Sequence, residues 1–282
     1  MSIKLIVDSA SDISENEAKQ MGAIMMPMTI TFGDKDYLDG VDLLPKQFYE
    51  KLIESDTLPK TSQINEYRFE QQFKQLTDEG YDVIAITLSS KLSGTYNSAL
   101  QAASGFEGKV YVVDSLNAAI GERLLVVYAL DLIKQGKTAQ EIVELLNEKK
   151  TKINLMAMLG TLEYLKKGGR ISAAVAFAGK LLSLKPVVSV VDGEVKLIGK
   201  ALGSKNGNNL LNRLVAEKGG IDFTMPYGVI YSGLDDSILK KYVTDSSHLW
   251  EGHTEQVSAY LIGGTIGTHV GPGAIGVAFF EK

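Results

Sequence analysis

The segment Val83-Ile-Ala-Ile-Thr-Leu88 is followed by a polar loop and then by a helical pattern over residues 94–103. A short apolar run with polar flanks is typical of a buried strand, and a helix after it is typical of α/β folds. The same order recurs on both sides: residues 3–7 and 110–113 are predicted strands, and residues 122–134 a predicted helix. This repetition predicts a mostly parallel sheet with flanking helices in the first half of the chain.

The second half of the chain has a different pattern. Residues 187–191 and 195–198 are predicted strands joined by Asp192-Gly193, which is a hairpin signal and introduces antiparallel pairing. Further strands are predicted at 228–231, 255–260 and 274–280, and further helices at 138–150, 206–217 and 237–243. We therefore expect an α/β protein with two α/β domains. Residues 1–150 would form the N-terminal one, and residues 151–282 a C-terminal one with a mixed or antiparallel sheet and helices.

Composition excludes several classes of protein. The chain has 282 residues, of which 45% are hydrophobic and 22% charged, as in ordinary soluble proteins. A net charge of -5 argues against nucleic acid as a partner, and the absence of cysteine excludes disulfides and thiolate catalysis. Three dispersed histidines give no zinc-ligand spacing, so no metal is expected.

The first apolar run ends after three residues, too short for a signal peptide or membrane span, so a cytoplasmic location is expected.

Two hydroxyl-rich segments follow strand or turn signals. Ser93-Gly94-Thr95 lies between a predicted strand and a predicted helix, where hydroxyls and free amides favour a carboxylate or phosphate. Thr61-Ser62-Gln63 precedes a helical pattern that begins near residue 65. For each segment a helix cap is the alternative interpretation.

The third segment of interest is glycine-rich. Residues 263–276 include six glycines around His269, which places a titratable ring on backbone that glycine accommodates easily. A loop that contacts a ligand is the favoured interpretation, and a hydrogen-bonded loop histidine is the alternative. Together with Thr61 and Ser93, His269 predicts one polar site.

Three cations surround a glycine pair at the end of a helical pattern: Lys166 and Lys167 before it, Arg170 after it. Cations near the carbonyl end of a helix are the ordinary explanation. Alternatively, the Arg170 guanidinium faces a cleft and binds an acidic ligand or the acidic surface of a partner.

In combination, these segments resemble the DegV family over nearly the entire chain. Each fragment is modest, but their order and spacing are specific. The matching residues are 7–12, 61–63, 89–96, 114–115, 164–171 and 267–273.

The resemblance implies a two-domain protein that binds one long-chain fatty acid, with the carboxylate near the hydroxyls of Thr61 and Ser93 and the tail buried. It also implies the binding subunit of a two-component fatty acid kinase, not an enzyme by itself. A separate ATP-binding subunit would convert the bound carboxylate to an acyl phosphate for phospholipid synthesis. With the interpretation above, no cofactor is expected and His269 would at most assist transfer. The ligand set is Thr61, Ser62, Ser93, Gly94, Thr95, Arg170 and His269, and the partner-docking set is Lys166, Lys167 and Arg170.

Candidates for lining the tail are Met25, Met26 and Met28, Met156 and Met158, and residues 173–182, with core packing as the alternative for each. The main rival function is a serine-dependent acyl ester hydrolase with Ser93 as nucleophile and His269 as base. No Gly-x-Ser-x-Gly surrounds Ser93, which counts against it. Neither phosphate-binding glycine motif is present, which argues against nucleotide binding. A purely structural or regulatory protein is the third alternative.

Overall fold

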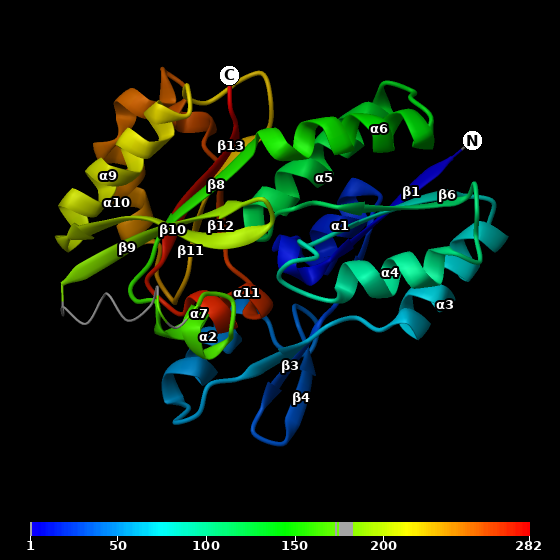
Figure 1. Cartoon of the computed structure of the whole chain (residues 1–282), viewed down its shortest axis with the longest axis horizontal. Helices are drawn as coiled ribbons and strands as arrows, with labels where there is room; N and C mark the ends of the chain where they lie inside the picture. Colours follow the sequence, from blue (N-terminus) through cyan, green and yellow to red (C-terminus); the bar gives the residue numbers. More distant parts are fainter. Residues whose placement is uncertain (1, 173, 175–182) are drawn as a thin grey trace.

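A four-stranded parallel sheet forms the centre of the first half of the chain (Figure 1). The computed structural model describes residues 2–172, 174 and 183–282. The strand order is β2-β1-β6-β7, with bounds β1 Ile3–Asp8, β2 Ile24–Met26, β6 Asp82–Thr87 and β7 Val110–Asp114. All six residues of β6 are buried, as expected for a strand covered on both faces. The predicted parallel sheet is confirmed.

Helices cover both faces of this sheet. On one face, Phe69 and Phe73 of α3 (Glu66–Asp78) and Ala99 of α4 (Thr95–Ala103) pack on Ile6 and Val83. The other face packs on α5 (Ala119–Lys134) and α6 (Ala139–Lys149). Successive strand residues point to opposite faces, so the apolar runs serve both cores. Helix α6, predicted over residues 138–150, begins with a capping box between Thr138 and Glu141, and α1 spans Glu15–Met21.

The second half of the chain forms a six-stranded sheet of order β10-β9-β8-β13-β11-β12. Only β11 and β12 pair in parallel; the other neighbours are antiparallel, so the expected mixed sheet is confirmed. The bounds are β8 Ile153–Met158, β9 Leu184–Val191, β10 Glu194–Leu202, β11 Tyr227–Tyr231, β12 Ala259–Leu261 and β13 Ile275–Phe280. The helices are α7 Glu163–Lys167, α9 Gly203–Glu217, α10 Ser237–Asp245 and α11 Gly264–Val270.

Helix α5 lies between the two sheets (Figure 1). Its buried residues Leu124 and Leu125 belong to a core that also includes Leu5 of β1 and Leu155 of β8. This shared core fixes the carboxyl edge of the parallel sheet against the C-terminal sheet. The prediction of a boundary near residue 150 falls just before β8.

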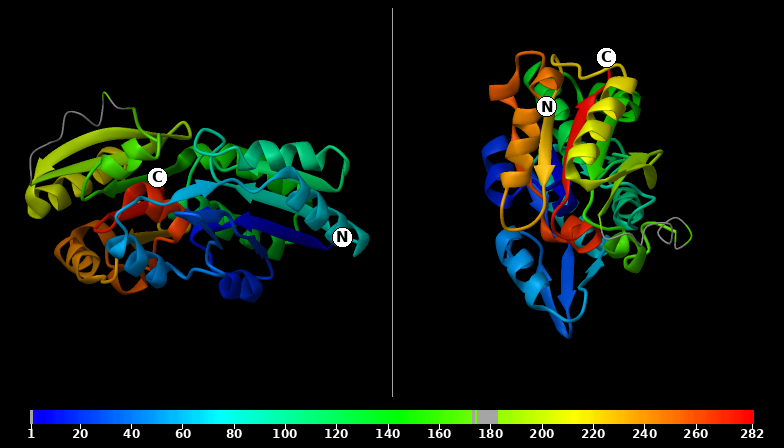
Figure 2. Two further views of the ribbon diagram at one scale, coloured as in Figure 1. Left: turned by 90° about the horizontal axis from the view of Figure 1, so that it is seen from below. Right: turned by 90° about the vertical axis from the view of Figure 1, so that its left-hand side faces the viewer.

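A third, small antiparallel sheet projects from the body of the molecule (Figure 1, Figure 2). It has the order β4-β3-β5, with bounds β3 Thr29–Phe32, β4 Lys35–Leu38 and β5 Lys60–Ser62. Helix α2 (Pro45–Glu54) packs Phe48 and Tyr49 against Ile30 and Phe32 of β3. The sequence patterns did not predict these short strands.

Two local predictions are wrong. Residues 255–260 were expected as one strand, but Thr254–Gln256 forms a 3-10 turn and the strand β12 begins at Ala259. The glycine-rich stretch around His269 was expected as a loop, but half of it, including His269, is helix α11. The predicted tail-lining segment 173–182 lies outside the described residues except for Ala174.

Candidate functional site

An apolar cavity lies where the two large sheets and α11 meet. It holds about 820 Å³ of space free of protein atoms, open mouth included. Its apolar wall comes from both halves of the chain: Met28, Leu88, Leu92, Ala118, Ala119, Leu155, Ala157, Leu159, Leu165, Val188, Val190, Val195, Ile230, Ile262, Ile266, Val270 and Ala274. Six polar residues also line it: Thr61, Ser93, Arg170, Ser189, Thr265 and His269.

Thr61 and His269 meet at this cavity although 208 positions separate them in the chain. Thr61 Oγ1 lies 3.0 Å from His269 Nε2, within hydrogen-bonding distance. Because successive side chains in a strand alternate, Ser62 of β5 points the other way, is exposed and does not line the cavity. The structure therefore brings Thr61 and His269 together and leaves Ser62 apart from them.

The His269 ring is largely enclosed. Burial, with a smaller contribution from the positive charge of Arg170, lowers its pKa from 6.5 to about 4. His269 Nδ1 is buried and has no hydrogen-bond partner among the described residues. A side chain at Gly168 would collide with the ring at Nδ1, so that glycine makes room for it. The imidazole is therefore neutral at physiological pH.

Ser93 belongs to a loop that the first strand holds in place. Asp8 at the end of β1 accepts a hydrogen bond from Leu88 N through Oδ2 at 2.9 Å, which fixes the start of the loop. Ser93 Oγ accepts from Thr95 N at 3.2 Å and lies 3.0 Å from Thr95 Oγ1. Thr95 is buried and does not line the cavity, so its hydroxyl orients Ser93.

Gly94 is the N-cap residue of α4 and makes no side-chain cap. A Cβ there would collide with the side chain of Gln63, which donates to Ser98 Oγ at 2.9 Å. Glycine thus allows the segment after β5 to pack on the start of α4. Gly94 lies on the outside of the cavity, in the cleft described below.

Arg170 is half-buried just beyond α7. Its Nε donates to Leu92 O at 3.1 Å, and its Nη1 donates to Gly168 O at 2.6 Å. The guanidinium thereby joins the Ser93 loop to the glycine pair beside His269. Lys166 and Lys167 are exposed on α7 and line neither the cavity nor the cleft.

A wider, polar outer cleft adjoins the apolar cavity. The cavity and the outer cleft share Leu92, Ser93, Arg170 and Val195. The outer cleft is lined by residues 90–94, 169–172 and 194–197. Across it, Ser89 Oγ donates to Gly193 O at 2.7 Å and ties the β9–β10 turn to the loop after β6. Ser93 and Arg170 therefore stand at the boundary between the enclosed space and solvent.

The N-terminus of α11 contacts two carboxylates, Asp12 and Asp39. Asp12 Oδ1 accepts from Gly263 N at 2.7 Å, and Asp39 accepts from Gly264 N and Thr265 N at 3.0 and 3.1 Å. Burial raises the pKa of Asp39, and the hydrogen bonds from Thr265, Ser9 and Gly264 oppose that shift. Asp39 and Thr265 were not predicted from the sequence, because a turn aspartate and one threonine among many carry no recognisable signal.

The glycines of α11 serve close packing. A Cβ at Gly267 would lie 2.6 Å from Phe48 Cε1 and 2.8 Å from Tyr49 Oη, and one at Gly271 would collide with the Tyr164 ring. The prediction that these glycines form a loop around His269 is therefore corrected: they let α2 and α7 approach α11.

Of the five methionines considered for the tail, Met28 lines the cavity. Met25 and Met26 lie in the cores of the parallel sheet, and Met156 and Met158 in the core behind the C-terminal sheet. In the described part of the chain, no group of three or more histidine, aspartate or glutamate side chains is arranged to bind a metal ion. Across the same residues, no helix combines the length and apolarity that crossing a membrane requires.

The fold is a two-sheet α/β architecture with an apolar cavity, polar at one end, where the sheets meet. A family model described as "Uncharacterised protein, DegV family" matches residues 2–282, so the chain belongs to the DegV family. A DegV domain-containing protein of Halalkalibacterium halodurans is 34% identical over 280 residues, covering 99% of this chain and 98% of that protein.

Two solved structures match over the entire length of both chains. A DegV family protein from Thermus thermophilus, described by its fatty acid binding, superimposes with a TM-score of 0.88 at 29% identity. The fatty acid kinase B3 protein of Streptococcus pneumoniae, loaded with linoleic acid, has a TM-score of 0.83 at 23% identity, which shows a shared fold.

Proposed function

We propose that this protein binds a long-chain fatty acid, with its carboxylate at Thr61, Ser93 and His269 and its tail in the apolar cavity. The observation that carries the proposal is the Thr61–His269 pair beside Ser93 in a cavity whose wall is otherwise mostly apolar. Fatty acid binding by the Thermus thermophilus relative supports the same ligand.

The hydrogen bonds leave two hydroxyl hydrogens for a carboxylate. An orphaned buried N–H is rarer than an orphaned acceptor, so Nδ1 of His269 is best assigned as the unprotonated nitrogen. Nε2–H then donates to Thr61 Oγ1, and the Thr61 hydroxyl is free to donate into the cavity. Ser93 Oγ accepts from Thr95 N, and with the Thr95 hydroxyl assigned as the donor in their 3.0 Å contact, Ser93 keeps its own hydrogen for the ligand.

The tail supplies most of the affinity. Each methylene transferred from water to an apolar wall contributes roughly 0.8 kcal/mol, so a tail of about sixteen carbons outweighs two or three hydrogen bonds. The polar end then fixes which end of the ligand faces the outer cleft.

The second part of the proposal is that the protein presents the carboxylate to a separate ATP-dependent kinase subunit and is not itself the enzyme. A carboxylate oxygen attacks the terminal phosphorus, the bond to the nucleoside diphosphate breaks, and an acyl phosphate forms. Neutral hydroxyl donors hold the carboxylate without a close ion pair, which keeps it nucleophilic. Arg170 lines both the cavity and the outer cleft, and we expect its guanidinium to interact with the incoming phosphoryl group. Such a reaction belongs in the cytoplasm, where ATP is abundant.

The geometry gives less support to the hydrolase. A serine hydrolase needs its histidine bonded to the nucleophile and oriented by an acid. Here His269 Nε2 lies against Thr61, and its Nδ1 has no carboxylate partner in the described structure. A pKa near 4 also makes the ring a weak base at neutral pH.

Native mass spectrometry of protein purified mildly from cells tests the lipid proposal. We expect an added mass that extraction identifies as a long-chain fatty acid, displaced by excess oleate. Protein that carries no such mass and does not bind oleate would refute it. Purified protein should show no hydrolysis of an acyl ester; hydrolysis that disappears in Ser93→Ala would favour the hydrolase instead.

Docking of the kinase subunit is tested separately. Lys166 and Lys167 are exposed next to the cleft-lining residues 169–172, so Lys167→Glu should weaken association with the partner while oleate affinity stays unchanged. Arg170→Ala should lower the rate of phosphorylation of the bound fatty acid even when the partner is bound. Equal partner affinity in wild type and Lys167→Glu would remove this lysine from the docking set.

A further inference from the structure

Helix α11 carries two cavity-lining groups on a backbone that lacks a cap of its own. Thr265 and His269 are four residues apart and therefore lie on one face of the helix. The N-cap residue is Gly263, which has no side chain, and Gly264 and Gly267 have low helix propensity. A seven-residue helix of this composition is not stable by itself, so other elements must hold it.

Two carboxylates from the N-terminal half of the chain hold it. Three successive N–H groups, of Gly263, Gly264 and Thr265, donate to Asp12 and Asp39 at 2.7 to 3.1 Å. The first N–H groups of a helix have no partner within the helix, so acceptors from elsewhere in the chain must satisfy them when they are buried. These carboxylates therefore replace the missing cap across more than 220 positions of sequence.

Both carboxylates are anchored in turn. Asp39 is 1% exposed, and its backbone N donates to Met28 O at 2.9 Å. Asp12 has left-handed backbone (φ 58°) and donates from its own N to Ser9 O at 3.2 Å. This left-handed conformation ends the 3-10 turn Ser9–Ser11, and aspartate adopts it more readily than most residues other than glycine.

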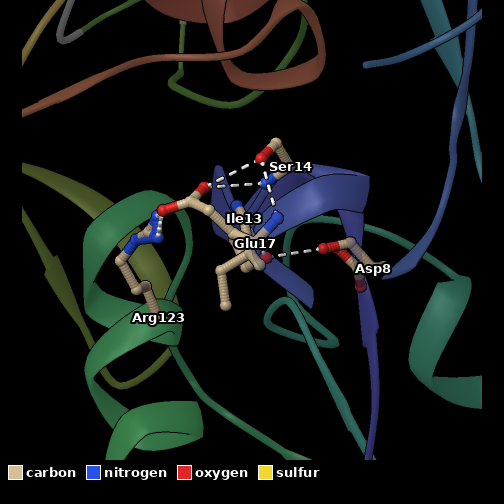
Figure 3. A network of polar contacts seen from close by, with 6 residues as sticks. Asp8, Ile13, Ser14, Glu17 and Arg123 are labelled. Carbon is tan, nitrogen blue, oxygen red and sulfur yellow. Dashed lines mark hydrogen bonds and ion pairs between the residues drawn. The ribbon is translucent and has the colours of Figure 1, made fainter. Parts of the chain in front are cut away.

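The segment after Asp12 is fixed as well. Glu17 accepts hydrogen bonds from Ser14 through one oxygen and from the buried Arg123 guanidinium of α5 through the other (Figure 3). The Arg123 guanidinium also lies 3.9 Å from the centre of the Tyr260 ring in β12, directly before α11. The turn that carries Asp12 is thereby joined to the strand that leads into α11.

The glycine pair at the start of α11 makes this contact sterically allowed. A Cβ at Gly263 would lie 3.1 Å from Asp12 Oδ1, and one at Gly264 would lie 3.1 Å from Asp39 Oδ1 and would also collide with Ile30 Cδ1. Larger residues would push the carboxylates away from the N–H groups. Burying a carboxylate is unfavourable, so these contacts are expected where they fix a geometry that matters.

We propose that Asp39, assisted by Asp12, is a positioning residue for the head-group site. By binding the N-terminus of α11, it fixes where Thr265 and His269 face the cavity and so keeps His269 Nε2 on Thr61. Its effect on ligand rests on the proposed function, whereas its effect on the His269 ring does not.

The test compares Asp39→Asn with a matched control, Asp82→Asn. Asn preserves the size of the side chain but loses the charge and one of the two acceptors. Asp82 is also buried, but it lies at the start of β6, at the end of the strand away from the cavity, and is paired with Lys109. The readouts are ¹⁵N NMR of the imidazoles, with His269 assigned by its loss in His269→Gln, and affinity for oleate. In Asp39→Asn we expect displaced His269 signals and about tenfold weaker oleate binding, with Asp82→Asn like wild type.

A folded Asp39→Asn protein whose His269 signals match wild type overturns the proposal. If circular dichroism shows that Asp39→Asn does not fold, Asp12→Asn takes its place: displaced His269 signals support the proposal and unchanged signals overturn it. If the signals move but even wild type fails to bind oleate, the proposed function fails while the positioning role stands.

Discussion

His269 acts as a hydrogen-bonding group in this site because burial keeps its ring neutral. Burial lowers the pKa to about 4, and the Thr61 hydroxyl occupies Nε2. A neutral imidazole orients Thr61 without placing a positive charge beside the carboxylate of the proposed ligand. At the scale of single residues, the site is thus a set of oriented hydroxyls.

The buried histidine makes stability depend on pH. Its pKa is about 4 in the folded protein and about 6.5 in the unfolded chain. As pH falls from 6.5 to 4, the unfolded chain therefore binds a proton at this ring that the native protein excludes. Over this range the free energy of unfolding of wild type should fall by up to about 3 kcal/mol relative to that of His269→Gln. Urea unfolding of both proteins from pH 4 to 8 measures this difference. If the free energies of unfolding of wild type and His269→Gln changed equally with pH between 6.5 and 4, the assignment of a buried neutral ring would be contradicted.

Loss of either hydroxyl should weaken head-group binding. Thr61→Val keeps the shape of the side chain but removes the donor, and Ser93→Ala removes the other. Each should weaken oleate binding by about 1 to 3 kcal/mol, because an acceptor of the buried carboxylate is left unpaired. Isothermal titration measures the affinities. Ser62→Ala is the control, since its hydroxyl is exposed on the opposite face of β5, and should bind like wild type.

At the scale of elements, α11 depends on close packing and not on helix propensity. Its glycines admit Phe48 and Tyr49 from α2 and Tyr164 from α7. Helix α2 thereby encloses the His269 end of α11 on one side, and α7 encloses it on the other.

Gly267→Ala should therefore destabilise the protein. The added Cβ would lie 2.6 Å from Phe48 Cε1, and such overpacking typically costs about 1 to 3 kcal/mol despite the better helix propensity of alanine. Thermal unfolding measures the change. Gly105→Ala is the control, because nothing lies within 4 Å of a Cβ there. A Gly267→Ala protein as stable as the control would show that α2 yields to the methyl group.

The elements differ in how far sequence patterns predict them. Long apolar runs such as Asp82–Thr87 predict their strands because burial on both faces requires continuous apolar residues. The strands of the small sheet have three or four residues and mixed polarity, which no periodicity reveals. Helix α11 was missed because tertiary packing overrides the low propensity of glycine. Asp39 reaches α11 through the fold, so no local pattern identifies it.

At the scale of the whole molecule, the cavity exists because the two sheets meet across α5. The residues proposed to bind the head group come from β5, the loop after β6 and α11, whereas Leu155 and Ala157 of β8 and Val188 of β9 form part of the apolar wall. A ligand would thus contact both halves of the chain and stabilise their association, because it binds only the folded arrangement.

This arrangement predicts that the C-terminal sheet determines the tail length that fits. Ala157 is buried in β8 and lines the cavity, so Ala157→Leu adds three carbons to the wall. Excluding about two methylenes should weaken binding of an eighteen-carbon acid relative to a fourteen-carbon acid by roughly tenfold. Competition binding across a series of saturated fatty acids measures this ratio. The exposed Ala216→Leu should leave the ratio unchanged. If Ala157→Leu weakened all chain lengths equally, the tail would not reach β8, and the cavity would be occupied from another direction.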